Sequence, residues 1–370
     1  MEALLGKTLS ELQDVALAIG LPKFAGKQLA EWLYVRRVCS FDEMTNISLK
    51  GREALKARYA VGRTQPVREA VSTDGTRKYL FGVLQQSGLS ANEENGLCSS
   101  GERSERSYVE SVYIPEEERA TLCVSTQVGC KMGCRFCMTG TLGFHGHLSA
   151  ADILNQVFAI DRLLAAGDRQ PLTNLVFMGE GEPMDNLDQV MRALTVLTAD
   201  YGCAWSPKRI TVSTVGIPAM KRFLDESDCH LAVSLHNPFG AERALIMPAE
   251  KMMHATEVVE LLRRYDWTHQ RRISFEYICW AGRNDTPRHA RELLRLLHGL
   301  NCRVNLIRFH EGVNRDFPSS DMRQMEWMRD YLTQNGLTTT IRRSRGEDIL
   351  AACGMLVAEQ NNINLAKGRL

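Results

Sequence analysis

Long apolar runs and a large excess of charge of either sign are both missing from this chain of 370 residues. No stretch approaches eighteen uninterrupted apolar residues, and the opening segment MEALLGKTLSELQD contains acidic side chains where an export signal has an apolar core. We therefore expect neither a membrane-spanning helix nor an export signal, and we predict a cytoplasmic protein. The net charge of +1 excludes a protein that acts as a bulk polycation, but it leaves room for a local basic surface.

Cysteine, in contrast, is frequent, with 11 residues. A cytoplasmic chain rarely carries a static disulfide framework, so these cysteines indicate metal binding, redox chemistry or simple burial. The hydrophobic content of 44% over this length is enough for one large core and a smaller accessory domain.

Residues 1–62 contain three amphipathic patterns with helical spacing, which predict a small helical accessory domain. The patterns cover residues 7–20, 24–37 and 48–60. The first begins with Thr8 and Glu11 at the spacing of a capping box. Basic residues mixed with Trp32 and Tyr34 are typical of a solvated helix face, and they would also suit contact with a folded RNA.

Residues 63–118 read as a β-hairpin and strand linker that contains a polar insertion. The pair Asp74-Gly75 in REAVSTDGTRKYLFGVL predicts the hairpin turn. The polar segment 85–106 has too few apolar residues to order itself, so we interpret it as an inserted loop. Strand patterning resumes at 108–115, which we expect to pair across this loop.

Residues 119–370 alternate apolar strand patterns with amphipathic helices. The strand patterns are TLCVST, NLVFMG, RITVST, HLAVSLH, ISFEYIC, VNLIRFH and TTTIRR. This rhythm predicts an α/β fold with a full or partial βα barrel of the TIM type; a doubly wound open sheet is the alternative. Reactive groups of such barrels lie at the C-terminal strand ends. The polar residues there are Glu180, Glu182, Ser213, Ser234, His236, Glu276 and His310.

Cys130, Cys134 and Cys137 lie in the loop after the first barrel strand with the spacing C-x3-C-x2-C. Structural zinc needs four protein ligands, usually in two pairs, and no second pair stands nearby. Three thiolates instead suit a [4Fe–4S] cluster, whose fourth iron stays open for a small molecule. A zinc site completed by a distant ligand and a redox C-x2-C pair are the alternatives. On residue type alone, Cys123 just upstream is a buried small hydrophobic residue.

These cysteines, with Phe136 before the last of them, form a motif typical of radical S-adenosylmethionine enzymes. The segments ATLCVSTQVGCKMGCRFC, GEGEPMDN, AVSLHNP, NLIRFH and SRGEDILAACG resemble the RlmN and Cfr group of RNA methyltransferases. The resemblance is nearly full length, departs mainly near residues 85–106, and is closer to the RlmN branch. It implies a partial barrel and methylation of C2 of an adenosine in 23S rRNA and in certain tRNAs. The Cfr branch, which methylates C8, shares every quoted motif, and another radical enzyme such as an activase is a further alternative.

The resemblance also implies how the cysteines act, with two molecules of S-adenosylmethionine per turnover. Cys353 corresponds to the thiol that first receives a methyl group, and Cys123 to the thiol that later attacks its sulfur, forms a transient disulfide and releases the methylated base. Glu110 corresponds to the proton acceptor. Without the resemblance, Cys353 would be a structural residue and Glu110 a solvent-facing one.

The resemblance assigns S-adenosylmethionine to a further set of residues. They are Gly181, Glu182, Ser213, Ser234, Leu235, His236 and His310. His310 stands where many relatives have Asn, so a packed histidine is an alternative there. Glu180 departs from the apolar residue usual in GEGEP, and we expect it to be solvated.

RNA contact is expected at the barrel mouth, where TIRRSRGED supplies Arg342, Arg343 and Arg345 for phosphates. Ordinary exposed charges are the alternative interpretation. The expected partners are thus 23S rRNA, tRNA and an electron donor such as flavodoxin or ferredoxin, with the chain itself a monomer.

Overall fold

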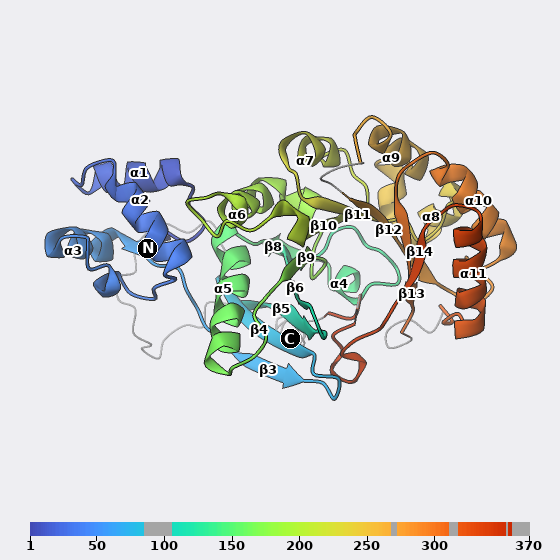
Figure 1. Cartoon of the computed structure of the whole chain (residues 1–370), viewed down its shortest axis with the longest axis horizontal. Coiled ribbons are helices and arrows are strands. Elements are labelled where there is room, and N and C mark those ends of the chain that lie inside the picture. Colours follow the sequence, from blue (N-terminus) through green and yellow to red (C-terminus); the bar gives the residue numbers. More distant parts are fainter. Residues whose placement is uncertain (85–105, 268–271, 311–316, 353, 357–370) are drawn as a thin grey trace, which may run out of the picture.

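The computed structural model describes residues 1–84, 106–267, 272–310, 317–352 and 354–356 (Figure 1). The central feature is a ten-stranded sheet with the order β14-β13-β12-β11-β10-β9-β6-β5-β4-β3. The helical N-terminal part lies to one side of it, at the left of Figure 1. Among the described residues, no helix is long and apolar enough to cross a membrane.

The N-terminal part contains the three predicted helical stretches. The elements are β1 (Glu2–Ala3), α1 (Leu9–Ala18), α2 (Ala25–Ala30), the π-helix η1 (Glu31–Val35), the 3-10 helix η2 (Phe41–Glu43), α3 (Leu49–Arg58) and β2 (Tyr59–Ala60). The predicted capping box is present, since Thr8 N donates to Glu11 Oε2 at 2.8 Å and Glu11 N donates back to the Thr8 hydroxyl. β1 and β2, the first and last elements of this part, pair in parallel, so that its two ends lie side by side.

The predicted hairpin and its late partner strand are confirmed. β3 (Arg68–Val71) and β4 (Arg77–Leu84) pair antiparallel around Gly75, whose φ of 86° suits a tight turn. β5 (Arg106–Pro115) then pairs with β4. The segment between them is the predicted loop 85–106, of which residues 85–105 lie outside the described residues. Because β5 also pairs antiparallel with β6, one sheet spans the expected boundary at residue 118, and the domain division stays a prediction.

Seven strands form the parallel part of the sheet, one for each predicted strand pattern. They are β6 (Ala120–Cys123), β9 (Asn174–Phe177), β10 (Ile210–Thr214), β11 (His230–Ser234), β12 (Ile273–Cys279), β13 (Arg303–Arg308) and β14 (Thr339–Arg342). Neighbours follow one another in chain order, so the sheet winds in one direction and the doubly wound alternative is wrong. Within the described residues β14 and β3 are the two edges, so the barrel is partial.

Helices cover the outer side of this sheet (Figure 1). They are α5 (Ala150–Ala166), α6 (Leu187–Thr198), α7 (Met220–Glu226), α8 (Gly240–Ile246), α9 (Ala255–Leu262), α10 (Pro287–Leu297) and α11 (Met322–Gln334). The shorter elements are β7 (Gln127–Gly129), α4 (Met138–Thr141), β8 (Phe144–His147) and the 3-10 helices η3 (Pro183–Asn186), η4 (Pro207–Arg209), η5 (Pro248–Lys251) and η6 (Glu347–Ile349).

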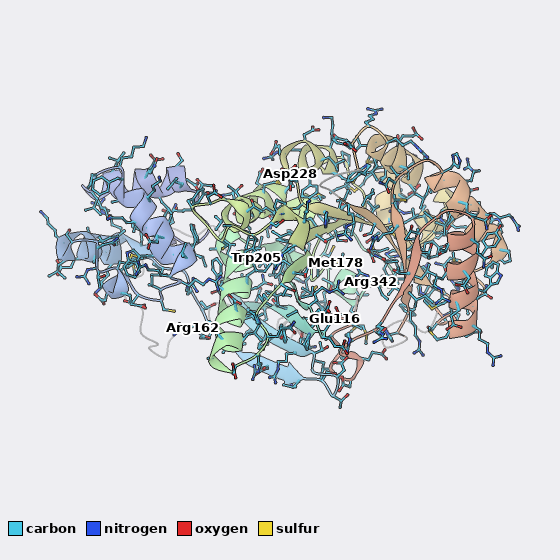
Figure 2. All side chains as sticks on the ribbon, in the orientation of Figure 1. Glu116, Arg162, Met178, Trp205, Asp228 and Arg342 are labelled. Atoms are coloured by element: carbon cyan, nitrogen blue, oxygen red, sulfur yellow. The ribbon has the colours of Figure 1, made fainter. Side chains whose placement is uncertain are left out.

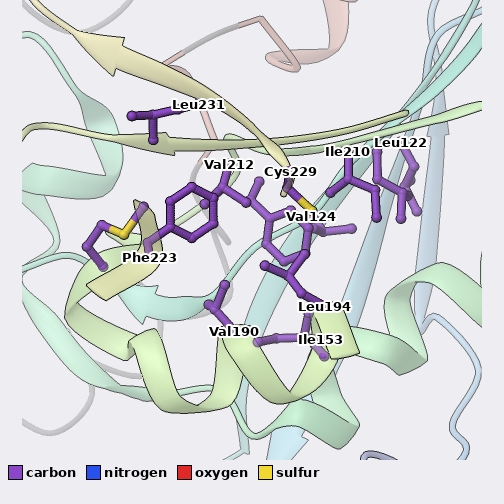
Figure 3. Close-up of a cluster of buried hydrophobic side chains, with 14 of the residues drawn as sticks. Leu122, Val124, Ile153, Val190, Leu194, Ile210, Val212, Phe223, Cys229 and Leu231 are labelled. Carbon is purple, nitrogen blue, oxygen red and sulfur yellow. The ribbon is translucent and has the colours of Figure 1, made fainter. Parts of the chain in front are cut away.

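The main core lies between the sheet and these helices. Figure 3 shows Ile210 and Val212 of β10 facing Leu194 of α6 and Phe223 of α7. All four are fully buried, and burial of each such side chain contributes about 1.5–3 kcal/mol. With its outer face packed in this way, the sheet leaves its inner face for the site.

The N-terminal part packs on α5 through both polar and apolar contacts. Arg37 forms an ion pair with Asp161, and the rings of Tyr34 and Phe158 lie 6.4 Å apart. One contiguous group of buried side chains therefore joins the N-terminal helices to the barrel. This contact fixes the helical part beside the barrel.

Candidate active site

The inner face of the barrel sheet encloses a cavity of about 670 Å³, and most predicted site residues line it. Those are Cys123, Cys130, Cys134, Cys137, Gly181, Glu182, Ser213, Ser234, His236 and His310. Leu235 and Glu110 are not part of its wall, and Cys353 lies outside the described residues. Side chains from strands far apart in the sequence thus meet in one space.

The loop that carries the three cysteines is shaped by a close backbone contact. Gly129 has a φ of 68°, and a Cβ there would lie 1.9 Å from the Gly143 carbonyl oxygen, so only glycine fits. Cys130 N donates to that same oxygen at 2.9 Å, and Cys137 N donates to Cys134 O at 3.1 Å. These bonds turn the loop so that all three cysteines reach the cavity.

The three thiols influence one another electrostatically. Burial raises the pKa of Cys130 to about 12, and it raises the pKa of Cys134 and Cys137 as well. A negative charge on one thiolate disfavours the ionisation of another, and Cys137 accordingly raises the pKa of both Cys130 and Cys134. Among the described residues, no three His, Cys, Asp or Glu side chains form a group tight enough for a single metal ion. Without a bound cationic group the thiols are neutral.

Glu182 lies on the cavity wall after β9 with only 2% of its surface exposed. Its Oε1 accepts from Met184 N at 3.0 Å, and its Oε2 accepts from Val215 N at 2.8 Å. Burial raises the pKa of this carboxyl to about 7, although both bonds favour its charged form. Each oxygen retains a lone pair, so the carboxylate is able to accept from an ammonium group in the cavity.

Gly181, next to it, is required by the geometry. Its φ is 98°, and a Cβ would lie 2.6 Å from the Cβ of Gln127. Gln127 cannot give way easily, because its Oε1 accepts from Glu182 N at 2.8 Å. The glycine thus lets the Glu182 backbone approach the loop after β6.

His236 lies two residues after the end of β11 and has an unusual positive φ of 55°. Its Nδ1 accepts from Ile278 N at 3.1 Å, so the neutral ring carries its proton on Nε2. Burial and, to a smaller degree, the charge of Arg243 lower its pKa to about 3. The ring of Phe136, from the cysteine loop, meets it edge-on at 4.9 Å. Leu235 instead faces the core with 1% of its surface exposed.

His310, after β13, reaches toward the C-terminal segment. Its Nε2 lies 2.5 Å from Ser344 Oγ, and its Nδ1 lies 3.4 Å from Glu347 Oε2. Burial lowers its pKa, against the opposing effect of Glu347. The residue lines the cavity as the resemblance implies, and it also has packing partners as the alternative implies.

Cys123, at the end of β6, packs against the C-terminal segment. A separate buried group contains Cys123, Val112, Ala351 and Leu356. Ala352 and Gly354, which flank position 353, line the same cavity as Cys123. The prediction that Cys123 is a buried small residue is confirmed, since it is 8% exposed. The residues Ala351 and Leu356, which pack against it, belong to the same segment as Cys353, the second predicted thiol.

The C-terminal segment is held at both ends by residues distant in sequence. On the hairpin side, Ser72 Oγ donates to Asp348 Oδ1 at 2.6 Å, and Gly346 N donates to Asp74 Oδ2 at 3.0 Å. On the cysteine-loop side, Met138 N donates to Gly354 O at 2.9 Å, and Thr139 Oγ1 donates to Leu356 O at 2.8 Å. The segment thereby lies across the cavity between β3–β4 and α4.

Glu110 is buried, with 5% of its surface exposed, so the solvent-facing alternative is wrong. Its Oε1 lies 3.0 Å from Lys78 Nζ, and the same ammonium is 3.4 Å from Leu350 O. β4 places Lys78 beside β5, which explains why alternation within β5 alone did not reveal the pair. The ion pair connects the predicted proton acceptor to the C-terminal segment.

Glu180 is buried at 1% exposed, so the expectation that it is solvated was wrong. The physical reason is a contact between the Glu180 side chain and the backbone of β5, in which Glu180 Oε1 accepts from Glu110 N at 2.9 Å. Glu180 N in turn donates to Ser125 Oγ at 2.8 Å. Burial, together with the charge of Glu110, raises the pKa of Glu180 to about 8.

Comparison with known proteins identifies the family. The family model "Ribosomal RNA large subunit methyltransferase N-terminal domain" matches residues 3–61, and the "Radical SAM superfamily" model matches residues 124–297. A "Probable dual-specificity RNA methyltransferase RlmN" of Phocaeicola vulgatus is 54% identical, with 96% of this chain and 94% of that protein covered. The chain belongs to the RlmN family. The family resemblance seen in the sequence motifs is thereby confirmed.

Further members of the RlmN family and a solved structure agree with this assignment. A "Dual-specificity RNA methyltransferase RlmN" of Syntrophobacter fumaroxidans is 40% identical over 95% of this chain and 97% of its own length. The crystal structure of a radical SAM methyltransferase from Sphaerobacter thermophilus is 35% identical, with a TM-score of 0.84 over 96% of this chain and 99% of that chain. The predicted fold class and the methyltransferase assignment are confirmed.

Membership of the radical SAM superfamily implies a [4Fe–4S] cluster and S-adenosylmethionine, and the cavity of this RlmN family member suits both. The three cysteines of one loop line it at the mouth, as a cluster with one open iron requires. The backbone-held carboxylate of Glu182 and the space left by Gly181 suit an amino group that approaches the loop.

Sequence reasoning missed Arg243, which organises the strand ends in this RlmN family member. Its guanidinium is 1% exposed and donates to the carbonyl oxygens of Leu235 at 3.0 Å, Ser234 at 3.0 Å and Val215 at 2.6 Å. A buried ion pair with Glu250 balances its charge. No pattern within GAERALI marks this arginine, because its partners lie at the C-terminal ends of β10 and β11 and on η5.

A polar network on the inner wall was only partly foreseen. Glu276 Oε1 accepts from Asn305 Nδ2 at 2.8 Å, and Glu276 Oε2 lies 3.4 Å from Arg342 Nε. Figure 2 shows Arg342 beside Met178, whose Sδ lies 3.7 Å from Arg342 Nη1. Strand-end reasoning found Glu276 but not its partners.

The three predicted RNA-contacting arginines therefore differ. Arg342 is paired with Glu276, and Arg345 Nη1 lies 4.0 Å from Asp74 Oδ2. Arg343 is exposed at the cavity mouth and, within the described part of the chain, forms no ion pair. Arg343 is thus the most accessible of the three to a phosphate.

Proposed function

We propose that this chain methylates C2 of an adenosine in 23S rRNA and in tRNA, with the methyl group carried on Cys353. The names of the relatives, dual-specificity RNA methyltransferases, support the substrate class. The observation that carries the proposal is the packing of Cys123 with Ala351 and Leu356, beside the cavity that the three other cysteines line. The chain thereby brings the neighbourhood of Cys353 within reach of the resolving thiol.

The cofactors, when bound, supply a methyl group and a carbon-centred radical in the cavity, and the proposal uses two molecules of S-adenosylmethionine per turnover. Cys130, Cys134 and Cys137 hold the cluster as thiolates. Glu182 and Gly181 receive the amino end of S-adenosylmethionine. The remaining contacts of that molecule come from Ser213, Ser234, His236 and His310, and from the backbone of Leu235.

Two residues of the chain then complete the reaction on the RNA adduct. Glu110, held by Lys78, accepts the proton from C2 of the adduct, and the adduct gives up its unpaired electron to the oxidised electron-transfer partner, so that the adenine ring is aromatic again. The Cys123 thiolate attacks the sulfur of Cys353; the new S–S bond forms as the C–S bond breaks, and its electron pair goes to the carbon, which takes up a proton. An external dithiol reductant must reduce the disulfide before the next turnover. Methylated RNA leaves with no bond to the protein.

RNA contact and the remaining partners complete the proposal. Arg343 binds a phosphate at the mouth, and the N-terminal helices support the RNA loop from which the base is unstacked. A flavodoxin or ferredoxin supplies the electron. The chain acts as a cytoplasmic monomer.

The decisive experiment isolates the resolving thiol. Cys123→Ala is expected to accumulate RNA covalently bound to the protein, because nothing then attacks the Cys353 sulfur. Cys229→Ala is the matched control, since it removes a buried thiol on the core side of the sheet. Denaturing gels with labelled tRNA measure the adduct, and free methylated product from the Cys123 variant would contradict the role.

Mass spectrometry of digested RNA tests the position of the methyl group. Ribosomal and transfer RNA from a strain lacking the gene is expected to lose C2-methyladenosine in both pools. Loss of C8-methyladenosine would instead identify the other branch of the family. Return of the C2 modification with the restored gene, and not with a Cys353→Ala variant, provides the control.

A further inference from the structure

The end of the barrel opposite the cysteines carries three cationic side chains and one histidine, which we name the basal cluster. It consists of Lys208, His230, Arg272 and Arg303. These residues stand at or just before the N-terminal ends of β10, β11, β12 and β13, which are consecutive in the sheet. All four line the same cavity as the catalytic mouth. The cavity therefore reaches both ends of the parallel strands.

The strand register directs the two arginines into the barrel. Arg272 precedes β12 and shares the inward side with Ser274 and Glu276, at alternate positions. Arg303 begins β13 and shares that side with Asn305. Ser274 pairs directly with Arg303 across the two strands, so the arginines are close neighbours.

The positive charges of the basal cluster have no acidic partner among the described residues. Lys208, Arg272 and Arg303 form no ion pair there, although surface cations elsewhere in the chain commonly do. One carboxylate, Glu116, lines this end of the cavity, and it is paired with Arg119 at 2.5 Å. Once Glu116 and Arg119 balance each other, the local charge is that of three cations unpaired within the described residues, Lys208, Arg272 and Arg303, in a chain whose net charge is only +1.

His230 adds a buried donor without a partner. Its side chain is 8% exposed, and its Nδ1 accepts from Arg272 N at 2.8 Å, so the neutral ring carries its proton on Nε2. Nε2 has no hydrogen-bond partner within the described structure, although the backbone of Lys208 is near enough to raise the pKa of the ring to a small degree. Burial, followed by the charges of Arg272 and Lys208, lowers the pKa of His230 to about 4. A buried N–H donor without an acceptor costs stability unless a ligand accepts from it.

We propose that the basal cluster is a binding site for a phosphate group. Two guanidinium groups, one ammonium and one imidazole N–H converge on one end of the cavity, and together they match the charge and acceptor oxygens of a phosphate. The group belongs either to a free phosphate anion or to the backbone of bound RNA. The proposal is independent of the methyl-transfer chemistry, because the basal cluster lies at the other end of the strands.

The first arm of the test uses inorganic phosphate and pyrophosphate as probes. The full chain with isotope-labelled histidine is titrated, and the His230 ring signal is followed by NMR. Saturable binding is expected to raise the pKa of His230, because a bound anion opposes the effect of the arginines. Arg272→Gln combined with Arg303→Gln is expected to weaken binding at least about tenfold, since hydrogen bonds from charged donors are stronger than neutral ones.

The second arm uses a tRNA transcript and measures how its affinity depends on salt. If the group is an RNA phosphate, the slope of log affinity against log salt should decrease by roughly 0.7–0.9 for each lost contact in the double variant. Arg323→Gln is the matched control, because it removes an exposed cation on the outer side of α11. Lys208→Gln, at an exposed position, provides a second variant if the double variant is unstable.

The two arms together decide the proposal. A response to the free anions alone identifies a small phosphate ligand, and a change in the RNA slope identifies the backbone. Both responses require the basal arginines and not Arg323. If neither arm distinguishes the folded basal variants from the control, the proposal is wrong.

Discussion

The two ends of the barrel strands differ in whether their charged side chains form ion pairs within the chain. At the C-terminal mouth, several charged groups are paired within the chain, as in Glu110 with Lys78, Glu276 with Arg342, and Lys131 with Asp185, and Arg343 is the exception. At the N-terminal end, the cations of the basal cluster have no such partners among the described residues. The mouth is thus preorganised by its own residues, whereas the base depends on a ligand to balance its charge.

The largest expected effect is the difference between replacing a cysteine at the mouth and replacing a cysteine at the base. Cys130→Ala at the mouth should abolish both iron binding and activity, because it removes a direct ligand; even indirect partners of metal ligands cost roughly 10–100-fold. Cys302→Ala, just before β13 at the base, should retain both. Iron content and methylation after anaerobic reconstitution measure the difference. Equal iron in the two variants would contradict the assignment of the cluster.

The next effect concerns stability and pH at the mouth. The pKa of Glu180 rises from 4.5 in the unfolded chain to about 8 in the folded one, so the folded protein holds a proton that the unfolded chain releases. Stability from this group is complete below about pH 4.5 and is lost as the pH rises through 8. Glu180→Gln should therefore be more stable than the wild type by roughly 2–4 kcal/mol at pH 9 and equally stable at pH 4.5.

Urea denaturation at both pH values measures this difference. Glu116→Gln is the control at the base, because Glu116 is ion-paired and partly exposed there. A stability difference for Glu180→Gln that does not depend on pH would show that the carboxyl titrates normally.

A smaller effect is expected for cofactor affinity. Glu182→Gln should weaken S-adenosylmethionine binding roughly 10–100-fold, since one charge-assisted hydrogen bond contributes about 1.5–3 kcal/mol. Because the pKa of Glu182 is about 7, wild-type affinity should increase between pH 6 and pH 8 as the carboxylate forms. Calorimetry under anaerobic conditions measures both. A pH dependence that persists in the variant would assign it to another group.

The smallest effect concerns RNA at the mouth. Arg343→Gln should reduce the salt slope of RNA binding by roughly 0.7–0.9, as one phosphate contact is lost. Arg342→Gln should in addition disturb the cavity, because it leaves Glu276 without its ion partner. Filter binding over a range of salt concentrations compares the two. An unchanged slope for Arg343→Gln would remove that residue from the interface.

The part of the molecule that sequence reasoning predicted well has local signals. Each strand of the parallel sheet appeared as a short apolar run, and the helix after Thr8 appeared with its cap. The cysteine spacing likewise drew attention to the loop after β6, whose three cysteines all line the cavity, while their role as cluster ligands stays a prediction. These features depend on residues within a few positions of one another, so periodicity and spacing are enough to find them.

The sequence by itself thus determined which loops at the strand ends carry thiols, carboxylates and glycines. Tertiary structure alone decided that Glu180 is buried under β5, that Arg243 binds three strand-end carbonyls, and that Ser72 and Asp348 fasten the C-terminal segment. It also decided which cations remain unpaired. The physical reason is that burial and pairing depend on neighbours up to hundreds of residues away along the chain, which only the folded sheet brings into contact.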